Sequence, residues 1–262
     1  MHFTVNGNSS YCYTNSRDID PDKLSIVFIH GSGMDHTVFT LAARHFARHG
    51  NNVIAVDLPG HGRSEGEPLT AIESIADWIV AALDALSIDQ AALVGHSLGS
   101  LVAMDCAARH PQRVRALAMV GTTAPMPVSD AILNAAEDDD HAAFDMLTQW
   151  GYSKRHQYGG NRNSGMWMIG STLRLFERSR PGVLFADMSA CNNYSAGVER
   201  AAQVRCPVQL ILGAEDRLTP VRSTQPLQAA FTSPQVTVLD GAGHTIMVEA
   251  PNALLDALHE VL

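Results

Sequence analysis

Residues 92 to 101 read ALVGHSLGSL, which places a serine between two glycines at the point where one apolar run meets another. The run before Ser97 is short and rich in Val and Leu, which predicts a buried strand, and the residues after it favour a helix. A sharp turn from strand to helix strains its central residue and leaves no room for side chains at the flanking positions. Gly95 and Gly99 meet that demand, so we expect the Ser97 hydroxyl to project from the turn.

Short apolar runs alternate with helical patterns along most of the chain. The runs suit strands buried on both faces of a parallel sheet, and they cover residues 24–31, 52–57, 91–96, 114–122, 208–213 and 235–240. Helical patterns cover residues 35–49, 70–87, 98–110, 220–231 and 250–262. A hairpin with Asn6-Gly7 at its turn precedes them. The order predicts an α/β fold with a mostly parallel central sheet flanked by helices.

This alternation stops between residues 124 and 203, where no convincing core strand is found and Met, Trp and Tyr are frequent. We predict that residues 124–203 form a helical cap over the carboxyl edge of the sheet, and that residues 1–123 and 204–262 form the core domain. A cap over a cleft presents one face to the substrate, and the expected lining residues are Trp150, Met166, Trp167 and Met168. For Cys191 and Asn192, a pocket wall and a structural hinge are equally supported.

Composition favours a small-molecule substrate. The chain has 262 residues, is 46% hydrophobic and carries a formal net charge of −9, without a basic run that suits nucleic acid or an anionic membrane. The N-terminus has no leader-like pattern, and no apolar run is long enough to cross a bilayer. Four widely separated cysteines are read as reduced thiols of a cytoplasmic protein. The sequence gives no indication of the oligomeric state.

A serine hydroxyl is a poor nucleophile at neutral pH, so it needs a base and a group that orients the base. Asp216 follows the predicted strand 208–213, and His244 follows the predicted strand 235–240 after two glycines. Ser97, Asp216 and His244 each lie just past a strand, and the carboxyl ends of parallel strands meet at one edge of the sheet. We therefore expect these three side chains to converge, although Glu215 is an alternative to Asp216.

Five motifs in this order resemble the α/β-hydrolase fold superfamily: HGSGMD (30–35), DLPGHGRS (57–64), GHSLGS (95–100), LGAEDRLTP (212–220) and GAGHTIMVEAP (241–251). The resemblance implies that Ser97 is the nucleophile, His244 the base and Asp216, rather than Glu215, the acid. It also implies an oxyanion hole formed by the backbone N–H groups of Leu98 and Ser32.

The resulting hypothesis is a serine hydrolase that cleaves a carboxylic ester of a small to medium, largely uncharged substrate through an acyl-enzyme, without a cofactor or a metal. The alternatives are a lactonase, a carbon–carbon bond hydrolase of ring-cleavage products, and a ligand-binding receptor on the same fold. The carbon–carbon hydrolases typically carry Pro and Trp where this chain has Met34 and Thr245. Binding of an anionic substrate would need Arg174, Arg178 or Arg180, for which a solvated helix face beside Glu177 is the favoured interpretation.

Four further residues in these motifs are given supporting roles. His30 is expected to shape the oxyanion loop, His61 to mark a turn, and His96 to pack beneath the elbow. Asp57 is expected to anchor the loop of residues 58–64 by hydrogen bonds. The glycines of residues 31–33 do not form a dinucleotide-binding fingerprint.

Overall fold

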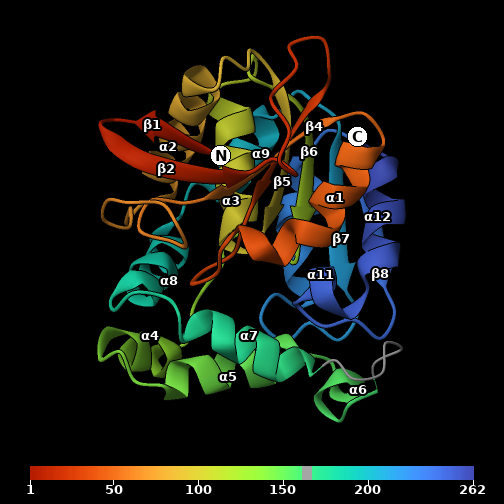
Figure 1. The fold of residues 1–262 in the computed structure, drawn as a ribbon. Coiled ribbons are helices and arrows are strands. Elements are labelled where there is room, and N and C mark those ends of the chain that lie inside the picture. The colour runs from red at the N-terminus through yellow and green to blue at the C-terminus, as the bar shows by residue number, and fades with distance from the viewer. Residues whose placement is uncertain (161–166) are drawn as a thin grey trace.

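The computed structural model describes residues 1–160 and 167–262, and its centre is an eight-stranded sheet in the order β1-β2-β4-β3-β5-β6-β7-β8 (Figure 1). The strands are β1 (His2–Val5), β2 (Asn8–Tyr13), β3 (Ser25–Ile29), β4 (Asn52–Asp57), β5 (Ala91–His96), β6 (Val114–Val120), β7 (Val208–Gly213) and β8 (Gln235–Leu239). Strands β1 and β2 run antiparallel to their neighbours, and all other pairs are parallel. The predicted mostly parallel sheet is confirmed.

The N-terminal hairpin turns at the two residues predicted for it. Val5 pairs with Asn8, so Asn6 and Gly7 form the whole connection. Their φ angles are 50° and 84°, the left-handed values that a tight primed hairpin turn requires. This turn brings β2 alongside β4 and thereby extends the parallel sheet at one edge.

Helices cover both faces of the sheet (Figure 1). One face carries α2 (Ile72–Ala85), α3 (Leu98–Arg109), α9 (Gly197–Gln203) and α10 (Gln225–Ala230), and the other carries α1 (Thr40–Arg48), α11 (Ile246–Glu249) and α12 (Pro251–His259). Strand β3 shows the reason: Val27 belongs to the core under α2 and α3, and Phe28 to the core under α1 and α12. Strands buried on both faces need apolar residues, which explains the continuous apolar runs of β3, β4, β5 and β7. The prediction of two-sided burial is wrong for β8, which lies at the edge of the sheet with Val236 and Val238 exposed.

The remaining helices form a layer beyond the carboxyl ends of the strands (Figure 1). They are α4 (Asp130–Glu137), α5 (Ala142–Gly151), α6 (Lys154–Gln157), α7 (Met168–Phe176) and α8 (Val183–Asn193). We call residues 124–203 the insertion. Its described residues contain no strand, and Ile132, Leu147 and Phe176 form a small core of their own with Met34. Helix α9, at the end of this range, packs against α3 and α10 instead.

Short 3₁₀ helices, η1 (His36–Phe39) and η2 (Val221–Thr224), complete the connections after β3 and β7. Among the helices of residues 1–160 and 167–262, none combines the length and the apolar character that crossing a membrane requires.

Candidate active site

Ser97 lies between the last residue of β5 and the first residue of α3, with φ 53° and ψ −119°. A positive φ at a residue other than glycine costs on the order of 1–3 kcal/mol, so the surroundings must impose it. A Cβ atom on Gly95 would lie 2.0 Å from the carbonyl oxygen of Gly99, and one on Gly99 would lie 2.3 Å from the carbonyl oxygen of Ile29. Only glycine fits at these two positions, which is the physical reason for the pattern around Ser97.

His244 contacts Asp216, the carboxylate that the sequence analysis assigned to it. The Nδ1 atom of His244 lies 2.8 Å from Oδ2 of Asp216, and both side chains are buried. Glu215 is exposed, and its carboxylate accepts a hydrogen bond from the backbone N–H of Lys154 instead. Because a carboxylate can only accept, Nδ1 of His244 carries a proton, and in the neutral imidazole the lone pair is therefore on Nε2.

Asp216 is held as a charged carboxylate by several donors. Its Oδ1 accepts from the backbone N–H groups of Leu218 and Thr219, at 2.9 and 2.8 Å, and its Oδ2 accepts from the Thr219 hydroxyl at 2.7 Å. Burial opposes ionisation, but the His244 ring and the Thr219 hydrogen bonds outweigh it and lower the pKa of Asp216 to about 2. The orienting group of His244 is therefore ionised at neutral pH.

The loop that carries His244 is fixed from two sides. A Cβ atom on Gly213, at the end of β7, would lie 2.0 Å from the carbonyl oxygen of Gly243, so the Asp216 and His244 loops touch through their backbones. The N–H groups of His244 and Thr245 both donate to the carbonyl of Gly151, the last residue of α5, at 2.8 and 3.2 Å. The insertion therefore contacts the backbone of His244 directly.

Glu249 forms a second link between the insertion and this loop. Its buried carboxylate accepts from the backbone N–H of Gly243 at 3.0 Å with Oε1, and from that of Ser153 at 2.9 Å with Oε2. The Nδ1 atom of His156, on α6, lies 2.9 Å from the same Oε2. Glu249 belongs to the motif of residues 241–251, but the sequence contained no signal of its partners in the insertion.

A cavity of about 180 Å³ between the sheet edge and the insertion brings Ser97 and His244 together with Ser32. The apolar part of its wall includes Met34, Met126, Val128, Ile132, Leu147, Trp150, Phe176 and Met188. Among the described residues, Arg217 is the only Lys or Arg in the lining, and no Asp or Glu lines it. The cavity therefore suits an apolar group attached to a reactive polar centre.

The two N–H groups predicted for the oxyanion hole lie near the elbow. Leu98 is the first residue of α3, where N–H groups lack intrahelical partners and the helix dipole favours negative charge. A Cβ atom on Gly31 would lie 3.2 Å from Cβ of Ser97, so the loop containing Ser32 touches the elbow. Within the described part of the chain, neither the Ser32 N–H nor the Leu98 N–H has a hydrogen-bond partner.

The predicted wall of the pocket is only partly found in the structure. Trp150 lines the cavity, Met168 is buried away from it, and Trp167 is 68% exposed with its ring over Gly170. Met166 lies outside the described residues. The prediction for Trp167 and Met168 fails because nearness in sequence does not tell which side of a helix start faces the sheet.

Cys191 and Asn192 have separate roles. The side chain of Cys191 lines the cavity, and Oδ1 of Asn192 accepts from the backbone N–H of Val128 at 3.0 Å. One residue is a wall of the cavity, and the next ties α8 to the chain that enters the insertion.

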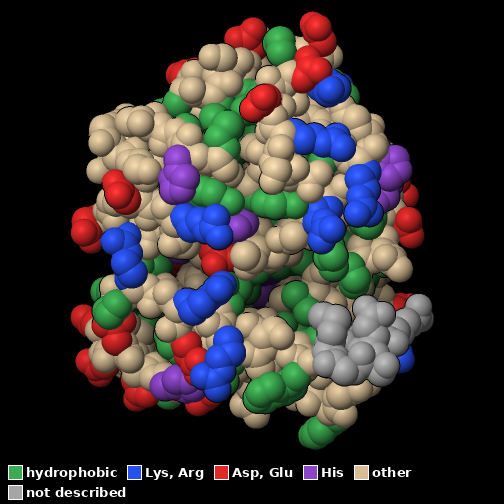
Figure 2. All heavy atoms as spheres, in the orientation of Figure 1, with side chains coloured by type: hydrophobic (Ala, Val, Ile, Leu, Met, Phe, Trp, Pro, Cys, Tyr) green, Lys and Arg blue, Asp and Glu red, His purple; other side chains and the backbone are tan. Residues whose placement is uncertain are grey.

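The three arginines weighed for an anionic substrate have partners outside the cavity. Arg174 pairs with Glu177, and the guanidinium of Arg178 lies 3.0 Å from Oδ2 of Asp35. Arg180 donates to the carbonyl groups of residues 60 and 66. Figure 2 shows Lys and Arg side chains around a hollow on one face. Arg174, Arg178 and Arg180 do not line the cavity that contains Ser97.

Two buried histidines near the site are neutral. His96 donates from Nε2 to the carbonyl of His244 at 3.1 Å, and burial, with the nearby His244, lowers the pKa of His96 to about 3. His30 donates from Nδ1 to the Gly31 carbonyl and accepts the Leu58 N–H at Nε2, and burial, with the nearby His61 ring, lowers the pKa of His30 to about 4. The structure confirms that His96 packs beneath the elbow and that His30 shapes the loop after β3.

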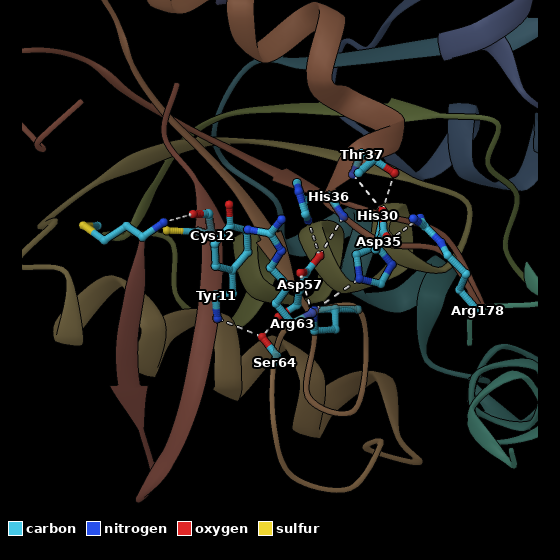
Figure 3. A network of polar contacts seen from close by, with 12 residues as sticks. Tyr11, Cys12, His30, Asp35, His36, Thr37, Asp57, Arg63, Ser64 and Arg178 are labelled. Carbon is cyan, nitrogen blue, oxygen red and sulfur yellow. Dashed lines mark hydrogen bonds and ion pairs between the residues drawn. The ribbon is translucent and has the colours of Figure 1, made fainter. Parts of the chain in front are cut away.

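Asp57 anchors the neighbouring loops, as predicted (Figure 3). Its carboxylate accepts from the backbone N–H and Nδ1 of His36 and from the N–H of Arg63, and its carbonyl accepts from the Ser64 hydroxyl. Asp35, His36 and Asp57 form the one described group that brings three possible metal-ligand atoms together. Because the oxygens of Asp57 already bind N–H donors, we assign this group to loop anchoring.

Sequence reasoning overlooked one pair of histidines with ligand spacing. His45 and His49 lie four residues apart, at the end of α1, and their rings are 4.2 Å apart. The Nε2 atom of His45 lies 2.8 Å from Nε2 of His259 on α12. These rings line no part of the cavity that contains Ser97.

Comparisons with known proteins agree with this geometry. A model described as the alpha/beta hydrolase family matches residues 26–257. The pimeloyl-[acyl-carrier protein] methyl ester esterase of Chromobacterium violaceum is 28% identical over 255 residues, which cover 90% of this chain and 93% of that protein. The enzyme of the same name from Neisseria meningitidis serogroup C is 31% identical over 245 residues, which cover 86% of this chain and 88% of that protein.

Among solved structures, the enol-lactonase from Burkholderia xenovorans LB400 superimposes with a TM-score of 0.87 and covers 99% of this chain and 98% of that one. At 19% identity this likeness concerns the fold alone. The matched residues 26–257 run from β3 to α12 and include Ser97, Asp216 and His244. The chain belongs to the alpha/beta hydrolase family.

Proposed function

We propose that this protein is a carboxylic ester hydrolase that works through an acyl-enzyme on Ser97. The observation that carries the proposal is that Ser97, at a strained helix N-terminus, and His244, oriented by Asp216, line one cavity. The relatives named as methyl ester esterases support the ester class. A receptor on the same fold would not need an ionised carboxylate to hold the imidazole in one tautomer.

The reaction begins when Oγ of Ser97 attacks the ester carbonyl carbon and Nε2 of His244 takes the hydroxyl proton. Asp216 stabilises the imidazolium that forms, and the Ser32 and Leu98 N–H groups bind the oxyanion. His244 then gives its proton to the leaving alkoxide, and the alcohol departs. A water molecule, deprotonated by the same imidazole, attacks the acyl-enzyme and releases the acid.

The substrate proposed is an uncharged ester whose acyl chain occupies the apolar cavity. Met34 and Met188 are flexible side chains that adapt to different chain shapes. An anionic group deep in the cavity would lie among apolar side chains without a cation to pair with, which is costly. Arg217 is exposed and lines the same cavity, so an anionic group would be tolerated only near that residue.

The proposed partner is this small-molecule substrate, and the proposed location is the cytoplasm. The four cysteines are unpaired, and Cys12, Cys106 and Cys191 are buried. Burial raises the pKa of each of these three thiols to about 12, which keeps them protonated and unreactive. These thiols suit a reducing compartment.

The test is a comparison of wild type and Ser97→Ala on p-nitrophenyl esters of increasing chain length, with lactones and a dienone acid in parallel. We expect the wild type to prefer the neutral esters, and Ser97→Ala to lose on the order of ten-thousand-fold or more in kcat while it folds normally. Turnover retained by purified Ser97→Ala contradicts the mechanism. A preference for the dienone acid contradicts the ester assignment and leaves the nucleophile in place.

A further inference from the structure

One side of α8 lies against the loop that follows β3. Leu184, Asp187 and Cys191 share a helix face, because they are spaced by three and four residues. A Cβ atom on Gly33 would lie 3.1 Å from Cδ1 of Leu184, and Sγ of Cys191 lies 3.9 Å from Oγ of Ser32. The loop proposed to bind the oxyanion is therefore packed against the insertion.

Residues 31–34 of this loop form a tight turn. The N–H of Met34 donates to the carbonyl of Gly31 at 3.2 Å, and Gly33 has φ 66°. A positive φ at the third residue is characteristic of a type II turn, which differs from type I in the orientation of its central peptide. The N–H of that peptide belongs to Gly33 and donates to Oδ2 of Asp187 at 2.8 Å. Asp187 therefore contacts the one peptide group that distinguishes the two turn types.

A second donor, the ring of His61, binds the same oxygen of Asp187 and forms an ion pair with it. Nε2 of His61 lies 2.9 Å from Oδ2 of Asp187, and Nδ1 of His61 lies 3.0 Å from the carbonyl oxygen of Pro59. Both ring nitrogens of His61 lie next to acceptor oxygens. The ring can donate to both of them at once only when it is protonated to the imidazolium form. Burial disfavours that charge, but Asp187 outweighs it and raises the pKa of His61. The two side chains are 2% and 1% exposed.

The other oxygen of Asp187 is buried and has no hydrogen-bond partner among the described residues. All of the hydrogen bonding of this carboxylate therefore passes through Oδ2, to Gly33 and His61. A buried carboxylate needs such partners, and removal of either donor leaves its charge poorly compensated.

We propose that Asp187 is a positioning residue: with His61 as its counter-ion, it holds the Gly33 peptide and so fixes the turn that presents the Ser32 N–H to the oxyanion. This inference rests on the proposed ester hydrolysis. It gives α8 a function beyond forming a wall of the cavity, because the insertion then helps to build the oxyanion hole.

The first test is Asp187→Asn, which keeps a neutral acceptor of similar shape and removes the charge. A loose oxyanion donor affects the transition state and leaves the ground state alone, so we expect kcat to fall about 10- to 100-fold with KM within about threefold. Amide hydrogen exchange at Gly33 should become faster. The matched control is Glu177→Gln, since Glu177 is also an insertion carboxylate paired with a histidine, His141, at 3.0 Å; its kcat should equal that of wild type.

The second test is the pH profile. Asp187 on α8, Asp57 at the end of β4 and His30 at the end of β3 face the His61 ring, and Arg180 binds the carbonyl of the preceding Gly60. Because the pKa of His61 is raised, the ion pair is complete below the ordinary histidine pKa of about 6.5 and is lost as the pH rises through the raised value. Wild type should therefore lose kcat at alkaline pH, and Asp187→Asn and His61→Gln should lack this decline.

The outcomes separate the inference from the proposed function. Wild-type kcat in Asp187→Asn with unchanged Gly33 exchange overturns the inference, while an inactive Ser97→Ala would still support the nucleophile. If Ser97→Ala stays active, the proposed function fails. In that case amide exchange at Gly33 in Asp187→Asn decides alone: faster exchange supports the role of Asp187 in the turn, and unchanged exchange contradicts it. If Asp187→Asn does not fold, the pH profile of His61→Gln decides. A decline of its kcat at alkaline pH like that of wild type contradicts the inference.

Discussion

At the carboxyl edge of the sheet, backbone constraints place the reacting groups, whereas the insertion is joined to that edge mainly through side chains. Ser97 has φ 53° because Gly95 and Gly99 let the strand and the helix meet without room for a Cβ atom. Gly213 and the His244 loop approach in the same way. Few other residues fit such positions, so this part of the molecule tolerates little change.

On each side of the cavity, a carboxylate–histidine pair joins the insertion to the core. Asp187 of α8 pairs with His61 of the core, and Glu249 of the core pairs with His156 of α6. The first carboxylate also binds the loop of Ser32, and the second also binds the loop of His244. Backbone geometry at the sheet edge therefore specifies the chemistry, and a few buried polar contacts with the insertion tune it. Substitutions at the sheet edge should therefore abolish turnover, and those in the insertion should adjust it.

The largest effect is expected at the sheet edge, for Asp216→Asn. The amide no longer enforces the productive tautomer of His244 or stabilises its imidazolium, so kcat/KM should fall about ten-thousand-fold. Glu215→Gln is the control, because Glu215 is exposed and contacts the insertion backbone instead of His244. Steady-state kinetics of both variants decide the assignment, and a larger loss in Glu215→Gln than in Asp216→Asn would reverse it.

A smaller effect concerns stability at acid pH. The pKa of Asp216 is lowered from 3.8 to about 2 in the native state. Below pH 4 this carboxylate is therefore protonated in the unfolded chain while it is still ionised in the native state. The contribution of this carboxylate is present above its ordinary pKa and should fall by about 2 kcal/mol as the pH drops to about 2. Urea unfolding of wild type and Asp216→Asn should show that the advantage of wild type shrinks in this window. A difference that does not change with pH contradicts a charged Asp216.

The smallest effect is expected in the insertion, from two tryptophans that the sequence could not tell apart. Trp150 lines the cavity and Trp167 is 68% exposed. Trp150→Ala removes the indole ring from the lining and enlarges the cavity, so it should shift the preferred acyl chain toward longer esters by several-fold in kcat/KM. Trp167→Ala should leave the chain-length profile as it is. Equal profiles for both variants and wild type would mean that the acyl chain binds elsewhere.

The reacting groups could be predicted because each has a local signal. Ser97 is marked by its glycines, and Asp216 and His244 follow apolar runs whose carboxyl ends must meet at one edge. The hairpin at Asn6-Gly7 was predicted for the same reason, since two adjacent residues determine its geometry.

The contacts of the insertion could not be predicted. His61 and Asp187 are 126 residues apart, and His156 and Glu249 are 93 apart, so no periodicity or spacing relates them. Nearness to Trp150 in sequence predicts that Trp167 lines the pocket, but Trp167 lies just before α7 with its ring over Gly170. Side-chain direction at the start of a helix depends on tertiary packing, which the local sequence does not show.

If the sheet edge makes Ser97 a nucleophile, a reagent specific for activated serines should label it covalently. Wild type, Ser97→Ala and Asp216→Asn would be treated with a fluorophosphonate probe and analysed by intact mass and peptide mapping. We expect a single adduct on the peptide that contains Ser97, absent from Ser97→Ala and formed far more slowly in Asp216→Asn. An adduct on another residue, or one that persists in Ser97→Ala, would contradict it.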